Sequence, residues 1–196
     1  MTLHQRLARR MYEIVSGHRC AVTEPFLAEW PETTALIARE PAALPVLAWL
    51  PQLLGQACDR TEALTRLLVE QAHRLDWRRT YGAADFGPDF LKRYGWTEII
   101  GQRGCFASDQ IAAGFLMLGP DLEYPPHSHE AEEIYIPLSG TAAWARGAEG
   151  WRERQPYELI HHPSHLPHAM KTAGEPLLAL YVWLGGDLAQ KPVITP

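Results

Sequence analysis

The spacing of apolar residues changes near residue 95 of this 196-residue chain, and this change constrains the fold more than any other feature. Before that point, apolar residues recur every three or four positions, as in the series Leu64, Leu67, Leu68, Ala72 and Leu75. Such spacing places them on one face of a helix. After it, short apolar runs are bounded by glycine and proline, which favours short strands joined by turns. The sequence therefore predicts a mainly β protein, with a small antiparallel barrel that follows a helical lobe.

The predicted elements divide the chain into two parts. We expect helices at residues 3–16, 33–39 and 43–56, and another that Asp59 caps, with Glu62 in capping-box position. A linker rich in turn-forming residues follows at 81–89. Strands are expected at 96–100, 111–118, 132–138, 141–145, 157–160, 169–172 and 177–184. We therefore assign residues 1–94 to a helical N-terminal lobe and residues 95–196 to a barrel domain.

Composition limits the kind of protein and its partners. Net charge is −5, from 18 basic and 23 acidic residues, so the chain lacks the basic surface that nucleic acid binding requires. The three cysteines are odd in number and widely spaced, which argues against a disulfide framework and for a reducing compartment. No apolar run approaches the roughly 18 residues that span a bilayer. We therefore expect a cytoplasmic protein that acts on neither membranes nor nucleic acid.

A cluster of potential metal ligands lies in the strand-rich half. His127 and His129 are two residues apart, so both imidazoles leave the same face of an extended strand. Glu133 follows closely, and His168 lies further along the chain. Three imidazoles and one carboxylate suit a borderline divalent ion such as zinc, iron, manganese, cobalt or nickel. The alternative is that the histidines are polar surface or core residues, but the combined spacing favours a metal site.

These residues resemble the two conserved motifs of the cupin superfamily. The run from Gly119 through His127, His129 and Glu133 to Gly140 is similar to the first motif. The segment 163–168 is similar to the second, except that His165 stands where glycine is usual. The resemblance implies a double-stranded β-helix barrel that binds one divalent metal ion. By the same resemblance, the ligands would be His127, His129, Glu133 and His168.

A narrower resemblance extends from Pro125 to Gly140. This pattern, with Tyr135 two residues after Glu133, is similar to that of the cupin-type dimethylsulfoniopropionate lyases, and most similar to the subgroup called DddQ. That family cleaves dimethylsulfoniopropionate to dimethyl sulfide and acrylate. The resemblance therefore implies a metal-dependent carbon–sulfur lyase with a small sulfonium carboxylate as substrate. It leaves open whether the chain forms a homodimer, as many cupins do.

The implied reaction is a β-elimination, and two tyrosines are candidates to take part. Tyr135 is expected to face the same interior as Glu133 and to act as the base, because a nearby cation favours the phenolate. Tyr124 matches a second family tyrosine near the substrate. The alternative for each is a buried tyrosine with a structural role only.

Other residues are candidates for substrate contact or for support of the ligands. Aromatic faces attract a sulfonium cation, and Tyr181, Trp183 and Trp144 are the expected wall residues. Because His161 and His162 are adjacent, only one of them can face the barrel interior if the segment is a strand. The roles of His161, His162 and His165, whether exposed, structural or supporting the ligands, stay open.

Two other classes of function remain open at this point. The chain could be another cupin metalloenzyme, either an iron dioxygenase or an isomerase. It could also be a cupin that binds a small molecule without catalysis, although the N-terminal half carries no basic recognition helix of the kind found in DNA-binding sensors.

Overall fold

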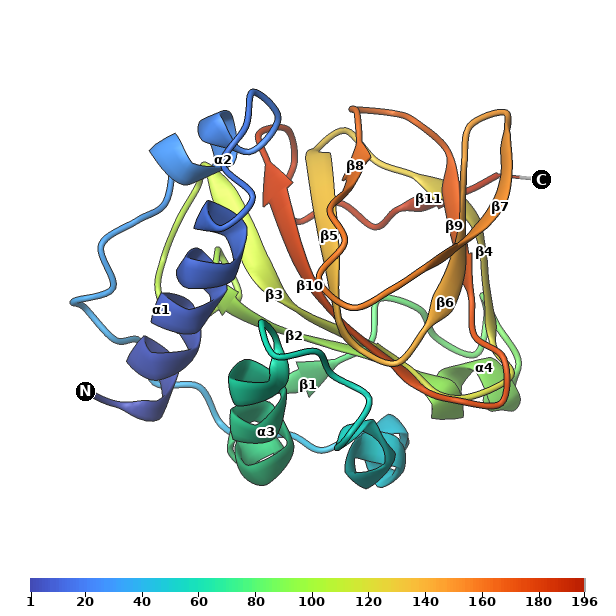
Figure 1. Cartoon of the computed structure of the whole chain (residues 1–196), viewed down its shortest axis with the longest axis horizontal. Helices are drawn as coiled ribbons and strands as arrows, with labels where there is room; N and C mark the ends of the chain where they lie inside the picture. The colour runs from blue at the N-terminus through green and yellow to red at the C-terminus, as the bar shows by residue number, and fades with distance from the viewer. Residues whose placement is uncertain (196) are drawn as a thin grey trace.

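The computed structural model describes residues 1–195 and contains two antiparallel sheets, with helices packed against one of them (Figure 1). Within these residues, the first sheet has the strand order β1-β2-β3-β10-β5-β8. Its strands are β1 Trp77–Arg78, β2 Tyr94–Ile100, β3 Ile111–Leu118, β5 Glu132–Ser139, β8 Ile160–His162 and β10 Leu177–Leu184. The predicted mainly β architecture is confirmed.

The second sheet faces the first and closes the barrel. In the described part of the chain its order is β11-β4-β9-β6-β7. Its strands are β4 Glu123–Ser128, β6 Ala142–Arg146, β7 Glu149–Arg154, β9 His168–Lys171 and β11 Val193–Ile194. In Figure 1 the first sheet lies between the helices α1 to α3 and this second sheet.

The helices come from the first half of the chain. They are α1 Leu3–Ser16, α2 Glu24–Ala28, α3 Glu62–Gln71 and α4 Pro88–Arg93, with 3-10 segments at Pro45–Leu53 and Ala72–Arg74. The Thr2 side chain caps α1 in a capping box with Gln5. No helix among residues 1–195 is long and apolar enough to cross a membrane.

Alternating side chains on the central strand separate two cores. On β10, Leu178, Leu180 and Val182 join a cluster with the helices, which includes Leu7 and Leu68. Because successive strand residues point to opposite faces, the neighbouring positions enter the barrel. Tyr181 is one of these, in a second cluster that is rich in aromatic residues. The apolar run of β10 is therefore buried on both sides.

Several predicted elements are confirmed. The helix at 3–16 and the strands at 111–118 and 177–184 have the predicted bounds. The predicted boundary at residues 94 and 95 falls at the start of β2, but β1 precedes that boundary and pairs with β2. The division into two units thus stays a proposal.

Other predicted elements are wrong. Residues 33–39 form no helix, because Ile37 donates its backbone N–H to the carbonyl of Cys105 (2.8 Å) instead of a helical partner. The residue at the N-cap of α3 is Thr61 and not Asp59. The segment 43–56 is a 3-10 helix at Pro45–Leu53, with Pro51 inside it. Proline lacks the N–H that a regular α-helix needs at that point.

Candidate metal centre

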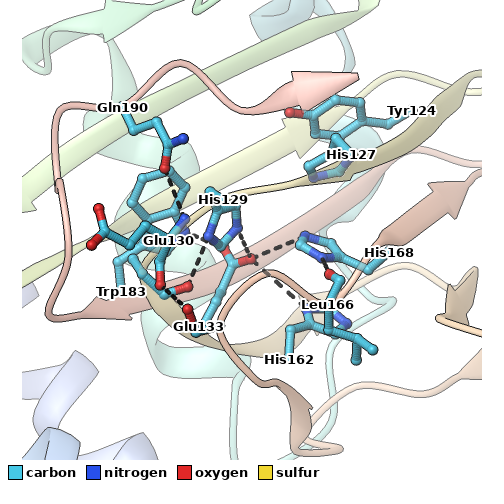
Figure 2. Close-up of polar contacts among 12 residues, drawn as sticks. Tyr124, His127, His129, Glu130, Glu133, His162, Leu166, His168, Trp183 and Gln190 are labelled. Carbon is cyan, nitrogen blue, oxygen red and sulfur yellow. Dashed lines mark hydrogen bonds and ion pairs between the residues drawn. The ribbon is translucent and has the colours of Figure 1, made fainter. Parts of the chain in front are cut away.

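The four predicted ligands meet inside the barrel, where both sheets contribute side chains. His127 lies on β4, His129 follows that strand, and His168 is the first residue of β9. Glu133 lies on β5 of the opposite sheet. His127 pairs with His168 across β4 and β9, and all four side chains are buried. Residues that are far apart in sequence thus converge on one buried point (Figure 2).

Three of the four groups come close enough to share an ion. The Oε2 atom of Glu133 lies 3.0 Å from Nε2 of His129 and 3.2 Å from Nε2 of His168. Ligand atoms from these three residues all lie within 4.8 Å of one another. Among residues 1–195, this tight group does not include His127, whose ring centroid lies 4.2 Å from that of His168.

Backbone carbonyls fix the tautomers of all three histidines. The Nδ1 atom of His127 lies 2.8 Å from the carbonyl oxygen of Pro125. The corresponding distances are 2.9 Å from His129 to Ala131 and 2.9 Å from His168 to Leu166. A carbonyl only accepts, so each Nδ1 carries the proton and donates it. Each Nε2 is therefore the atom available to a metal ion, as the chemistry of such a site requires.

The ionisation of these groups also fits a cation site. Burial raises the pKa of the Glu133 carboxyl, but the neighbouring His129 outweighs burial and holds that pKa well below its usual range. Burial, reinforced by His168, holds the pKa of His127 well below its ordinary value, so this ring is neutral. Burial lowers the pKa of His129, but Glu133 outweighs that effect and raises it. A divalent ion binds an anionic carboxylate and neutral imidazoles, so it would displace the proton that Glu133 favours on His129.

Trp183 contacts two of the predicted ligands directly. Its indole Nε1–H donates to Oε1 of Glu133 (2.7 Å), and its ring stacks on His129 with centroids 4.1 Å apart. The sequence predicted only a wall residue at this position. The contact depends on the register of β10 and β5, which pairs Trp183 with Glu133. Nothing in the spacing of two residues that lie 50 positions apart indicates it.

A cavity of about 480 Å³ opens beside three of the four predicted ligands. Tyr124, Tyr135, Tyr181 and Trp183 all line it, together with His127, His129 and Glu133. Trp144 does not belong to the lining. It is buried in the aromatic core of the barrel, where its ring centroid lies 6.3 Å from that of Tyr135.

The cavity wall also contains residues that the sequence reasoning missed. Glu98 and Trp96 reach it from β2, and Arg103 from the loop that follows. Glu98 is buried and accepts a hydrogen bond from the backbone N–H of Arg103 (2.6 Å). Alternation along β2 places Trp96 and Glu98 on one face, so strand periodicity was the signal that could have found them.

The two candidate tyrosines differ in their surroundings. Tyr124 stacks on His127, with centroids 3.9 Å apart, and its hydroxyl lies 2.9 Å from that of Tyr81. Burial and the neighbouring tyrosines raise the pKa of Tyr124. Burial, followed by the carboxylate of Glu133, raises the pKa of Tyr135 well above its ordinary value. The phenol of Tyr135 is therefore protonated unless a cation lies next to it.

The three other histidines near the second motif have separate environments. His161 is partly exposed and pairs with Glu132 at the surface (2.6 Å). His162 is fully buried and faces the ligands, in line with the alternation of adjacent strand residues. His165 is exposed and has a φ of 61°, the left-handed conformation that explains why glycine is usual at this position.

Comparisons with known proteins identify a family of enzymes to which the chain is similar. The family model for dimethylsulfoniopropionate lyase matches residues 22–179. The DddQ lyase of Ruegeria pomeroyi is 41% identical over 119 residues, which cover 61% of this chain and 59% of that protein. A putative DddL lyase of Cereibacter sphaeroides is 30% identical over 180 residues, which cover 88% of this chain and 73% of that protein.

Solved structures of lyases share the fold over nearly the whole chain. The crystal structure of DddQ from Ruegeria pomeroyi has a TM-score of 0.84 at 30% identity, and the match covers 98% of this chain and 96% of that one. A structure from a study of the lyases RdDddP and RnDddQII has a TM-score of 0.84 at 32% identity, over 98% and 100% of the two chains. The predicted β barrel with an N-terminal helical portion is confirmed, and this chain belongs to the dimethylsulfoniopropionate lyase family.

Proposed function

We propose that this chain cleaves dimethylsulfoniopropionate to dimethyl sulfide and acrylate, with one divalent metal ion held by His127, His129, Glu133 and His168. Family membership supports the reaction. The observation that carries the site is the set of three carbonyl-bound Nδ1 atoms, which makes Nε2 the ligand atom of each ring beside one ionised carboxylate. This donor set does not select among zinc, iron, manganese, cobalt and nickel.

The elimination needs a base next to the proton that is removed. When bound, a divalent ion supplies Lewis-acid stabilisation for the charge that develops on the substrate carboxylate, and it favours the phenolate of a nearby tyrosine. In our proposal, Tyr135 Oη takes the proton from the carbon next to the carboxylate. The electron pair of that C–H bond forms the double bond of acrylate. The C–S bond breaks, and its electron pair leaves with sulfur as neutral dimethyl sulfide.

We place the sulfonium end of the substrate against Tyr181, Trp96 and Glu98. All three line the cavity, and Glu98 contributes a buried carboxylate. A sulfonium is a fixed cation, so both aromatic faces and a carboxylate attract it. The ligand cluster lies on the Glu133 side of the same cavity and suits the substrate carboxylate. In our proposal, the substrate lies between these two regions, and Tyr124 orients its carboxylate end.

Headspace gas chromatography for dimethyl sulfide tests the proposal. We expect metal-loaded protein to release dimethyl sulfide, and Tyr135→Phe to retain its metal while turnover falls by about 100-fold or more, as loss of a general base implies. His129→Ala and His168→Ala should lose metal and activity together. Tyr12→Phe, which changes an exposed tyrosine of α1, is the matched control.

Two outcomes would contradict parts of the proposal. Near-normal kcat in Tyr135→Phe would remove this tyrosine from the mechanism. No dimethyl sulfide with any of the five metals would leave the ligand cluster in place and favour another cupin reaction. A cytoplasmic location and a homodimeric assembly belong to the same proposal and need fractionation and light scattering.

A further inference from the structure

His162 is a fully buried polar residue that packing alone does not explain. It is the last residue of β8, and its side chain has no exposed surface. Among residues 1–195, neither of its ring nitrogens has a hydrogen-bond partner. Buried polar atoms in proteins are nearly always hydrogen-bonded, and an apolar side chain would fill the same space without that cost. The imidazole therefore calls for a functional explanation.

The position of His162 places it against two metal ligands. Its ring stacks on that of His168, with centroids 4.0 Å apart and an angle of 9° between the planes. Its Nδ1 atom lies 3.7 Å from Oε2 of Glu133, which is its cross-strand partner on β5. Figure 2 shows the ring beneath His168, on the Glu133 side of the cluster.

The stacking excludes His162 as a further ligand in this arrangement. An imidazole binds a metal through a lone pair that lies in the plane of its ring. Two rings 4.0 Å apart and inclined by only 9° have planes that meet far from both rings, so His162 and His168 cannot both direct a lone pair at one nearby ion. The rings of His127 and His129 are inclined to that of His168 by 64° and 80°, so their planes do intersect its plane.

The carboxylate of Glu133 is a polar group close to the unpaired Nδ1 atom of His162. Three histidine nitrogens approach its Oε2 atom: His129 at 3.0 Å, His168 at 3.2 Å and His162 at 3.7 Å. In a metal-bound state, the Nε2 lone pairs of His129 and His168 would face the ion. These two atoms would then not donate to Oε2. His162 is then the remaining donor of the three. Trp183 already holds the other oxygen, Oε1.

We propose that His162 is a positioning residue of the metal centre, whose Nδ1–H holds Oε2 of Glu133 while its ring fixes the plane of His168. Partners of this kind, which orient metal ligands, typically contribute about 10- to 100-fold in metal affinity. The inference rests on the metal part of the proposed function and not on the substrate, so a test by metal binding is independent of whether dimethylsulfoniopropionate is cleaved.

Zinc titration of the metal-free protein against a chromophoric chelator tests this role. His162→Phe keeps the stacked ring and removes the donor, whereas His162→Asn places an amide N–H near the position of Nδ1. His162→Gln places its amide near Nε2 instead. His161→Phe is the matched control, because His161 is the adjacent residue and points to the surface. Cobalt absorption spectra report the ligand geometry, and thermal unfolding of the metal-free proteins reports the fold.

We expect His162→Phe and His162→Gln to bind zinc about 10- to 100-fold more weakly, with altered cobalt spectra. His162→Asn and His161→Phe should bind within a few-fold of the parent protein. The melting temperature of metal-free His162→Phe should stay the same or rise, because the substitution removes an unpaired polar group.

Three results would overturn the inference. The first is His162→Phe with parental zinc affinity and a parental cobalt spectrum. The second is weak binding by a folded His162→Asn, which would show that an N–H at this position is not what matters. The third is a fall in melting temperature that accounts for the loss of affinity, which would make His162 a structural residue. If His162→Phe does not fold, the zinc affinities of His162→Asn and His162→Gln test the inference, and equal affinities would overturn it.

Discussion

Glu98 is a buried carboxyl whose ionisation opposes folding. Burial raises the pKa of this carboxyl, against which the backbone N–H of Arg103 is the main opposing influence. A raised pKa means that the folded protein holds the proton more tightly than the unfolded chain. Folding therefore loses stability as the pH rises through that pKa and the carboxyl ionises. Glu98 lines the cavity, and in our proposal its charge binds the sulfonium end of the substrate.

We predict that Glu98→Gln makes the protein more stable than its parent at pH 7, with a difference that disappears near pH 4. The amide keeps an acceptor for Arg103 and carries no charge. The same variant should raise KM for dimethylsulfoniopropionate by about tenfold, since a charge at this depth contributes on the order of 1–2 kcal/mol. Urea unfolding at both pH values and steady-state kinetics check this. Glu123→Gln, on the exposed side of β4, is the control; equal effects in the two variants would contradict the prediction.

His165 shows what a motif substitution means physically. Its φ of 61° belongs to the left-handed region, which costs a residue other than glycine on the order of 1 kcal/mol. The backbone N–H of His165 donates to the carbonyl of His129 (2.8 Å), so this turn is hydrogen-bonded to a predicted metal ligand. The departure from the usual glycine therefore changes the side chain at the surface and leaves the turn intact.

At the scale of elements, Gly140 ends the first motif because the turn after β5 accepts no side chain. Its φ is 77°, and a Cβ at this position would collide with the carbonyl oxygen of Pro176, just before β10. Since β5 and β10 are paired, an added methyl group would push the turn away from the strand that positions Trp183.

We predict that Gly140→Ala lowers the free energy of unfolding by about 2–4 kcal/mol, from backbone strain and steric overlap together. Gly185→Ala separates the two causes. Gly185 has a similar φ of 66°, but a Cβ there would meet no atom within 4 Å, so strain alone should cost about 1 kcal/mol. Chemical denaturation of the two variants measures the difference. Equal losses would show that the contact with Pro176 is not the cause.

For the whole molecule, metal binding should stabilise the fold because the ligands join the two sheets. Glu133 comes from the first sheet, and His127 and His168 come from the second. At a free metal concentration 100 times Kd, binding adds about 2.7 kcal/mol. For a chain of this size that corresponds to roughly 5–10 °C in Tm.

Calorimetry with and without a chelator checks this prediction. We expect the chelator to lower the Tm of the parent protein and to leave that of His129→Ala unchanged. A parent protein that unfolds at the same temperature in both conditions would show that the ion does not link the sheets.

The sequence alone determined the features that depend on local spacing. Helical spacing of apolar residues predicted α1, and short apolar runs between turn-forming residues predicted β3 and β10, each with its bounds. Local composition did not reveal β7, whose residues are almost all exposed and polar, because an edge strand needs no apolar alternation. The helix expected at 33–39 does not form, because hydrogen bonds to the distant residues 102–105 outweigh the local preference for a helix.

At the site, the sequence determined which residue types gather, and the tertiary structure decided what each one does. His127, His129, Glu133 and His168 were predicted from their resemblance to two motifs, although the structure brings them together from β4, the residue after it, β5 and β9. The sequence did not predict the contact of Trp183 with Glu133 or the position of Trp144 outside the cavity. Nor did it predict which of His161 and His162 is buried. Those outcomes depend on strand register and sheet closure, which arise from packing among residues tens of positions apart, and so no local pattern records them.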